Sequence, residues 1–151
     1  MSQTLYDALR ASHEVQRSLL RSLVRIRDAG KRQAVFSELR IELAAHEAAE
    51  ERALYVPMLM DDAGLDASRH ALHEHHQIDE LVADLQGLAI DGKAWGKKAA
   101  ELSEKVHHHL REEEKKFFQV SGKILSDTQK AREGKRYLRE HAAMVRKLQQ
   151  A

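Results

Sequence analysis

The chain has 151 residues, 42% of them hydrophobic and 32% charged, with a formal net charge of +1. That length suits one domain with a core of its own, and the near-neutral charge gives no reason to expect nucleic acid as a partner. The lack of cysteine excludes disulfides and thiolate metal sites, and no apolar run approaches the length of a membrane span.

Strong helix formers dominate the composition, with one proline and seven glycines, so we expect an all-α protein. Leucines at helical spacing predict a first helix over residues 4–28, with Gly30 as its stop. A second set of apolar residues at helical spacing predicts a helix over residues 32–60. Within it, Pro57 removes a backbone donor and should kink or end the helix. Residues 61–64 are expected to form a loop.

The second half of the chain predicts two more helices of similar length. Asp66 or Ser68 is a good N-cap for a third helix that runs to about residue 89. A fourth helix is predicted over residues 93–121, with Gly122 as a candidate break. Four such helices joined by short loops favour an up-down-up-down four-helix bundle.

A C-terminal segment remains beyond this bundle. Residues 127–150 carry one apolar stripe and predict a further helix, with Asp127 as a candidate cap. We therefore expect a bundle domain over residues 1–125 and a C-terminal helical extension over residues 126–151. The extension either folds onto the bundle or meets a partner, and a homodimer formed through it is one alternative.

The most informative pattern is a histidine followed four residues later by a glutamate, which occurs twice. His46 and Glu50 form the first pair, and His109 and Glu113 form the second at the same relative positions. Four residues turn a helix by about 400°, so both members of a pair leave one face. On a helical wheel this is the apolar face, where a buried carboxylate must be paired or bound to a metal. The repeat predicts a metal site inside the bundle.

The first and third helices each contain one further inward histidine. His13 flanks an apolar stripe, although a single inward histidine is more often a hydrogen-bonded core residue than a ligand. On the third helix the wheel favours His75, whereas the repeat interval carried over from His13 selects His76. We prefer His75, because a one-residue difference in loop length costs less free energy than turning the apolar face of the helix outward.

Together these residues predict a mixed set of nitrogen and oxygen donors, contributed by all four helices. The predicted metal ligands are His13, His46, Glu50, His75, His109 and Glu113. Such donors suit iron or manganese, and two carboxylates can bridge two metal ions. Four other histidines (His73, His76, His107 and His108) and the glutamates beside the pairs (Glu51, Glu112 and Glu114) are predicted to face solvent. Glu47 and Tyr55 are candidates for supporting roles.

With these motifs the chain resembles hemerythrin-like proteins of the HHE cation-binding family, over residues 5–121. The resemblance implies a non-haem di-iron centre that holds two iron ions, with the six residues as ligands. It also implies that Glu50 and Glu113 bridge the ions together with an oxygen species. The oxygen-carrier branch has a second histidine one turn from the first on its third helix. In this chain the positions one turn before and one turn after His75 are Ala71 and Asp79. This departure argues against reversible oxygen carriage and for a more open coordination shell.

The resemblance also implies a function. We expect a metal-binding protein that interacts with oxygen, peroxide or nitric oxide, in sensing, detoxification or iron handling. A catalase-like or peroxidase-like activity is an option, although we favour a binding protein. The rival interpretations are non-enzymatic metal storage or buffering and a helical interaction module. No apolar signal region precedes the first helix, so we expect a cytoplasmic protein with no membrane partner.

Overall fold

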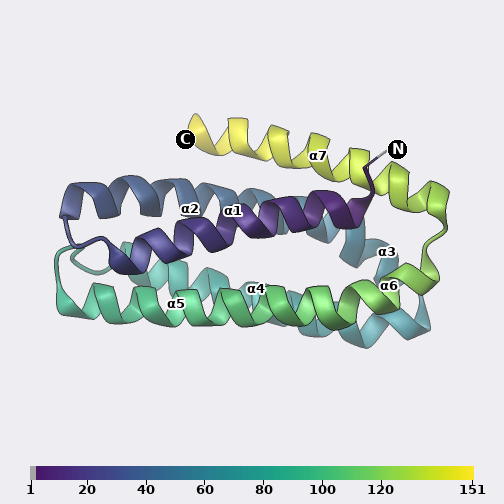
Figure 1. Ribbon diagram of the computed structural model, residues 1–151, viewed down its shortest axis with the longest axis horizontal. Helices are drawn as coiled ribbons and strands as arrows, with labels where there is room; N and C mark the ends of the chain where they lie inside the picture. Colours follow the sequence, from purple (N-terminus) through teal and green to yellow (C-terminus); the bar gives the residue numbers. More distant parts are fainter. Residues whose placement is uncertain (1–2) are drawn as a thin grey trace.

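The computed structural model describes residues 3–151, which form α-helices and no strand (Figure 1). Met1 and Ser2 lie outside the described residues. They belong to the predicted 1–125 domain and to the N-terminal segment in which no apolar signal region is expected. Helix α1, Leu5–Arg25, begins with a capping box formed by Thr4 and Asp7. Helix α2, Ala29–Glu50, begins at Asp28, which accepts a hydrogen bond from the amide of Lys31. Because Asp28 caps α2, Gly30 lies in its first turn and does not stop the preceding helix.

Helix α4, Asp62–Gln86, begins earlier than predicted. Asp61 has extended backbone angles, and its side chain accepts a hydrogen bond from the amide of Ala63, so it is the N-cap. The predicted loop over residues 61–64 is therefore wrong, and Asp66 and Ser68 lie inside the helix. Gly64 serves close packing, since a Cβ there would lie 2.7 Å from the carbonyl oxygen of Met58.

Both helices that carry the His-x-x-x-Glu pairs are interrupted by a wider π-helical turn. Helix α2 leads into a first π turn, Glu51–Tyr55, and then into helix α3, Val56–Leu59. Helix α5, Lys93–Glu112, leads into a second π turn, Glu113–Phe117, and then into helix α6, Phe118–Ile124. The sequence predicted continuous helices here.

The two residues expected to interrupt these helices, Pro57 and Gly122, both lie inside a helical segment. Pro57 lies in the first turn of α3, where its missing backbone donor is tolerated. Gly122 lies within α6 and does not break it. The end of α6 instead comes where Leu125 turns to extended backbone angles.

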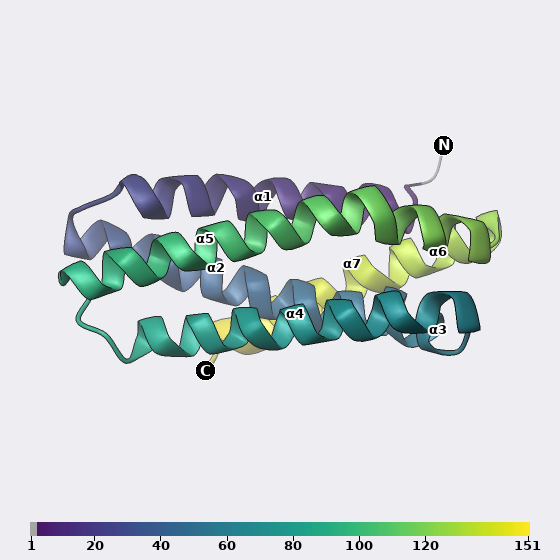
Figure 2. The same ribbon diagram turned by 90° about the horizontal axis from the view of Figure 1, so that it is seen from below.

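Four long helices, α1, α2, α4 and α5, run side by side in both views of the molecule (Figures 1 and 2). Helix α7, Asp127–Gln149, packs across α1 and α2 (Figure 1). Its N-cap is Ser126 rather than Asp127, because the Ser126 hydroxyl accepts a hydrogen bond from the amide of Gln129. The predicted four-helix bundle with a C-terminal helix is thus confirmed, and the C-terminal helix folds onto the bundle.

Two apolar clusters fill the bundle and leave a polar layer between them. One includes Leu5, Leu54 and Phe117, and the other includes Leu20 and Trp95. Along α1 and α4 the predicted ligand lies between residues of the two clusters. On α2, on α5 and in the second π turn, the predicted ligands lie close to the change from one cluster to the other. Within the described part of the chain, no helix has the length and apolar character needed to cross a membrane.

Candidate metal centre

The polar layer brings the six predicted ligands together. All six are buried, with at most 3% of each residue exposed. They form two groups of four, and the donor atoms within each group lie within 4.8 Å of one another. The first group is His13, His46, Glu50 and Glu113, and the second is Glu50, His75, His109 and Glu113. Glu50 and Glu113 belong to both groups, so their carboxylates stand between two clusters of donors.

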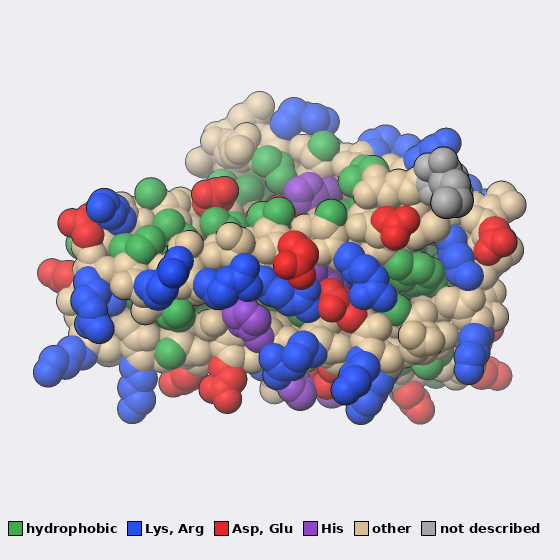
Figure 3. Space-filling model, in the orientation of Figure 1, with side chains coloured by type: hydrophobic (Ala, Val, Ile, Leu, Met, Phe, Trp, Pro, Cys, Tyr) green, Lys and Arg blue, Asp and Glu red, His purple; other side chains and the backbone are tan. Residues whose placement is uncertain are grey.

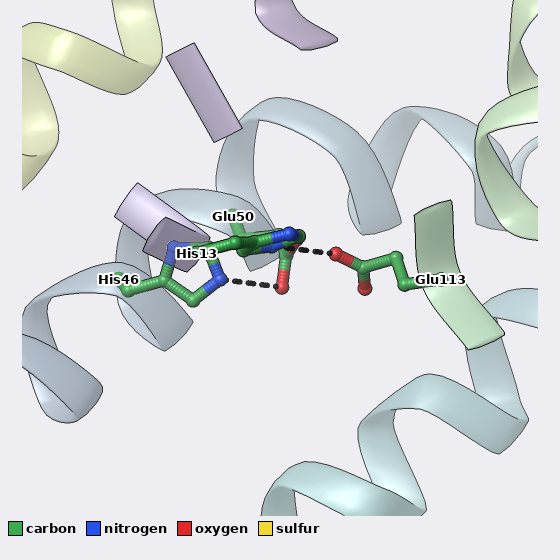
Figure 4. A group of neighbouring side chains, drawn as sticks. All are labelled: His13, His46, Glu50 and Glu113. Carbon is green, nitrogen blue, oxygen red and sulfur yellow. Dashed lines mark ion pairs between the residues drawn. The ribbon is translucent and has the colours of Figure 1, made fainter. Parts of the chain in front are cut away.

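The first group converges from three different helical segments (Figure 4). Nε2 of His46 lies 3.3 Å from Oε1 of Glu50, and Nε2 of His13 lies 3.3 Å from Oε1 of Glu113 (Figure 4). Nε2 of His13 also lies 4.0 Å from Oε2 of Glu50. The two imidazoles thus turn the same nitrogen toward the two shared carboxylates.

The second group completes the arrangement from α4 and α5. Nε2 of His75 lies 3.1 Å from Oε1 of Glu50, and Nε2 of His109 lies 3.6 Å from Oε2 of Glu113. His76, which the repeat interval selected, lies on the surface and pairs with Glu80 at 2.9 Å. The orientation of α4 is therefore the one that the helical wheel predicts.

Three of the four imidazoles are oriented through their other ring nitrogen. Nδ1 forms a hydrogen bond in His13 with Glu114 (2.6 Å), in His46 with Tyr137 (2.7 Å) and in His109 with Glu74 (2.9 Å). Carboxylates accept hydrogen bonds, and the Tyr137 hydroxyl accepts because it donates its own proton to Ser12. Each Nδ1 therefore carries a proton, so in the neutral ring the Nε2 lone pair is the one that a metal can use.

Several of the donor atoms that face the centre lack a hydrogen-bond partner among the described residues. Among the described residues, these buried unpaired atoms include Nε2 of His13, His46 and His109, and one oxygen each of Glu50 and Glu113. Each unsatisfied buried polar group costs about 1–3 kcal/mol. A cation in each donor group would satisfy these atoms, so the residues fit a metal centre.

The hydroxyl of Tyr55 reaches the same centre. Its oxygen lies 2.8 Å from Oε1 of Glu50, within hydrogen-bond distance of Oε2 of Glu113, and 3.2 Å from Nε2 of His75. The one hydroxyl proton is therefore shared between the two carboxylates. Tyr55 ends the first π turn, which puts a side chain five residues after Glu50 beside it. Burial and the two carboxylates raise the pKa of Tyr55 well above its usual range, so the hydroxyl remains protonated.

Without a metal, the two central carboxylates cannot both ionise easily. Burial and the negative charge of Glu50 raise the pKa of Glu113 to about 7. Burial also disfavours ionised Glu50, but His46 and the surrounding hydrogen bonds outweigh it and hold the pKa of Glu50 well below its usual range. For His13, burial lowers the pKa, whereas Glu113 and Glu114 raise it, with a net increase to about 9. Protons at Glu113 and His13 thus occupy positions that a cation would take.

Some supporting residues differ from the predictions. Glu114 was predicted to be a surface charge, but it bonds His13 and accepts a hydrogen bond from Arg17 at 2.8 Å. The prediction was wrong because the second π turn rotates the residues after Glu113 relative to a regular helix. The repeated motif could have indicated this role, because the second glutamate of each motif approaches a histidine. Glu114 bonds His13, and Glu51 lies 3.6 Å from Nδ1 of His75. Glu47 is buried but belongs to neither donor group.

The model of the family described as the hemerythrin HHE cation binding domain matches residues 4–120. The chain belongs to this family. A crystal structure of a hemerythrin HHE cation binding domain-containing protein from Mycobacterium kansasii has the same fold, with a TM-score of 0.85 and 22% sequence identity. The similarity covers 96% of this chain and 89% of that one.

A longer protein contains a related segment. A DNA nickase from Nostoc sp. is 25% identical over 125 residues, which cover 83% of this chain and 35% of that protein. The hemerythrin-like chain thus spans about a third of the length of this curated relative. The family membership and the buried cluster of histidines and glutamates together identify a metal-binding hemerythrin-like protein.

Proposed function

We propose that this hemerythrin-like chain holds two iron ions and binds a small oxidant or diatomic ligand such as oxygen, peroxide or nitric oxide. The unpaired Nε2 atoms and carboxylate oxygens that converge in the polar layer are the observation that carries this proposal. Glu50 and Glu113 would bridge the ions, since each belongs to both donor groups. Iron held by nitrogen and oxygen donors supplies redox chemistry and Lewis acidity when bound.

The chain's own residues would prepare the centre for metal. Glu114, Tyr137 and Glu74 fix three imidazoles so that Nε2 points inward. The Tyr55 hydroxyl holds the two central carboxylates by hydrogen bonds. Because Tyr137 comes from α7, we also propose that the extension, residues 126–151, supports the centre.

A pocket supports access for a small ligand. It has a volume of about 240 Å³ and is lined by both His109 and Glu113. Ala71 and Phe117 form part of its wall. The oxygen-carrier branch has a second imidazole one turn from the first on this helix, whereas here Ala71 contributes no donor to this wall of the pocket. Sensing, detoxification and iron handling all need such access.

The ligand can be tested on the iron-loaded protein. Nitric oxide added to the ferrous form without air, or peroxide added to the ferric form, should change the absorption spectrum. His108→Ala, an exposed neighbour of His109, should respond like the wild type, because His108 pairs only with Glu112 among the described residues. Unchanged spectra with oxygen, peroxide and nitric oxide, in protein shown to hold two irons, would contradict ligand binding and favour metal storage.

A further inference from the structure

A third cluster of metal-type donors lies outside the six residues of the buried centre. Donor atoms of His70, Glu74 and Glu112 lie within 4.8 Å of one another. Nε2 of His70 is 3.5 Å from Oε1 of Glu74 and 3.2 Å from Oε1 of Glu112. The side chains of His70, Glu112 and Glu74 are 54%, 26% and 4% exposed, so the cluster leads from solvent toward the interior.

The same pocket joins this outer cluster to the buried centre. The pocket of about 240 Å³ is lined by all three outer residues and also by His109 and Glu113. At its inner side, Nε2 of His109 and Oε1 of Glu113 are buried and lack a partner among the described residues. An ion held by the outer cluster would therefore have donors ahead of it along the pocket.

Glu74 belongs to both sets of residues. Its Oε1 atom lies 2.9 Å from Nδ1 of His109 and 3.5 Å from Nε2 of His70. The carboxylate that orients an imidazole of the centre thus also faces the exposed histidine. Through Glu74, the outer cluster is therefore directly connected to the buried centre and is not an unrelated surface feature.

We propose that His70, Glu74 and Glu112 form a transit site, which captures a divalent transition-metal ion at the surface and passes it to the buried centre. The inference rests on the proposed metal-binding function and adds the route by which metal enters. One imidazole and two carboxylates are donors that suit ferrous iron, manganese or zinc. The part of the chain that the structure describes supplies three donors to this site, which leaves the coordination incomplete and suits an ion that must bind and then leave.

Neighbouring positive and titratable groups contact the outer cluster and limit its affinity for a metal ion. Nζ of Lys105 lies 3.3 Å from Oε2 of Glu74, and Nε2 of His108 lies 3.0 Å from Oε2 of Glu112. These contacts use the outer oxygen of each carboxylate and leave each Oε1 facing His70. Histidine side chains also reach the surface over α5 (Figure 3). Lys116 lines the pocket and adds a positive charge that opposes tight retention of a cation.

The test compares the rate of metal entry with the final amount bound. The full chain, freed of metal by a chelator, is mixed with limiting ferrous iron, and the iron absorption is followed with time. The variant His70→Ala with Glu112→Gln should load at least roughly tenfold more slowly, the lower limit typical of losing a supporting metal-site residue. It should still reach the iron content of the wild type. His76→Ala is the control, because His76 is an exposed histidine of the same helix that pairs only with Glu80 among the described residues. This variant should load at the wild-type rate.

Equilibrium binding of cobalt gives a second readout that does not depend on iron chemistry. The wild type should bind one more cobalt ion per chain than the double variant. Equal loading rates and equal cobalt counts would overturn the transit site and leave the buried centre unaffected. A lower final iron content in a double variant of unchanged helicity would also overturn it, because the residues would then support the centre itself. A wild type that takes up no iron would instead refute the proposed function.

Discussion

At His46, a single hydrogen bond connects the donor set to the C-terminal helix. Tyr137→Phe removes the hydroxyl that accepts from Nδ1 of His46 and keeps the ring. We expect metal affinity to fall by roughly 10–100-fold, as for other partners of metal-bound histidines, and this is measured by competition with a chelator. Tyr6→Phe is the matched control, because its hydroxyl bonds Ser121 away from the donors. Equal affinities of the two variants would contradict the role of Tyr137.

The three consecutive glutamates after Arg111 should differ in their importance for metal. Glu113→Ala should lose the most iron, because this carboxylate belongs to both donor groups. Glu114→Ala should lose less, since it frees Nδ1 of His13 but removes no donor. Glu112→Ala should keep its iron at equilibrium. Metal analysis of the three proteins checks this order, and an equal content in the Glu112 and Glu114 variants would show that the hydrogen bond to His13 has no effect.

The donors of the centre could be predicted from the sequence, whereas most of their supports could not. A helical wheel turns His75 inward and His76 outward because each position depends only on its own helix. Tyr137 and Glu74 reach His46 and His109 from other helices, so their roles depend on tertiary packing. Glu114 lies within a π turn, where a wheel drawn for a regular helix gives the wrong direction.

At the level of helices, the packing of α7 on α1 depends on a glycine. A Cβ at Gly134 would lie 2.8 Å from the amide nitrogen of Leu5 and 2.9 Å from the carbonyl carbon of Thr4. Gly134→Ala must therefore push α7 away from α1, and overpacking of this kind costs about 1–3 kcal/mol. Thermal unfolding should show a lower midpoint temperature for this variant.

Gly122 is the control for this substitution. It also lies within a helix, but a Cβ there would meet no atom of residues 3–151 within 4 Å. Gly122→Ala should raise the free energy of unfolding by about 0.5–1 kcal/mol, through helix propensity alone. If both substitutions changed stability in the same direction, the close approach of α7 to α1 would be refuted.

The helices could be located from the periodicity of leucine and other apolar residues, but their ends could not all be placed. Asp61, Asp66 and Ser68 are all good capping residues, and only the close packing around Gly64 selects the first. The two π turns left no clear trace, since their residues are compatible with a regular helix.

For the molecule as a whole, metal ions should compete with protons for the donor atoms, so metal binding should release protons. In the metal-free protein the pKa of His13 is raised to about 9 and that of Glu113 to about 7. Both groups must lose a proton to bind metal, so affinity should rise with pH up to about 9 and fall on acidification. Metal added at pH 7 in weak buffer should acidify the solution, as followed with an indicator dye. Uptake without acidification, or occupancy unchanged down to about pH 3, would contradict this donor set.

The two-iron centre itself is tested most directly by metal content per chain, together with the absorption spectrum. The protein should be purified without chelator and then supplied with ferrous iron in air. We expect two iron ions per chain and a near-ultraviolet absorption band that zinc-loaded protein lacks. Fewer than one bound iron per chain after loading, or two bound ions with no such band, would contradict a di-iron centre in this bundle.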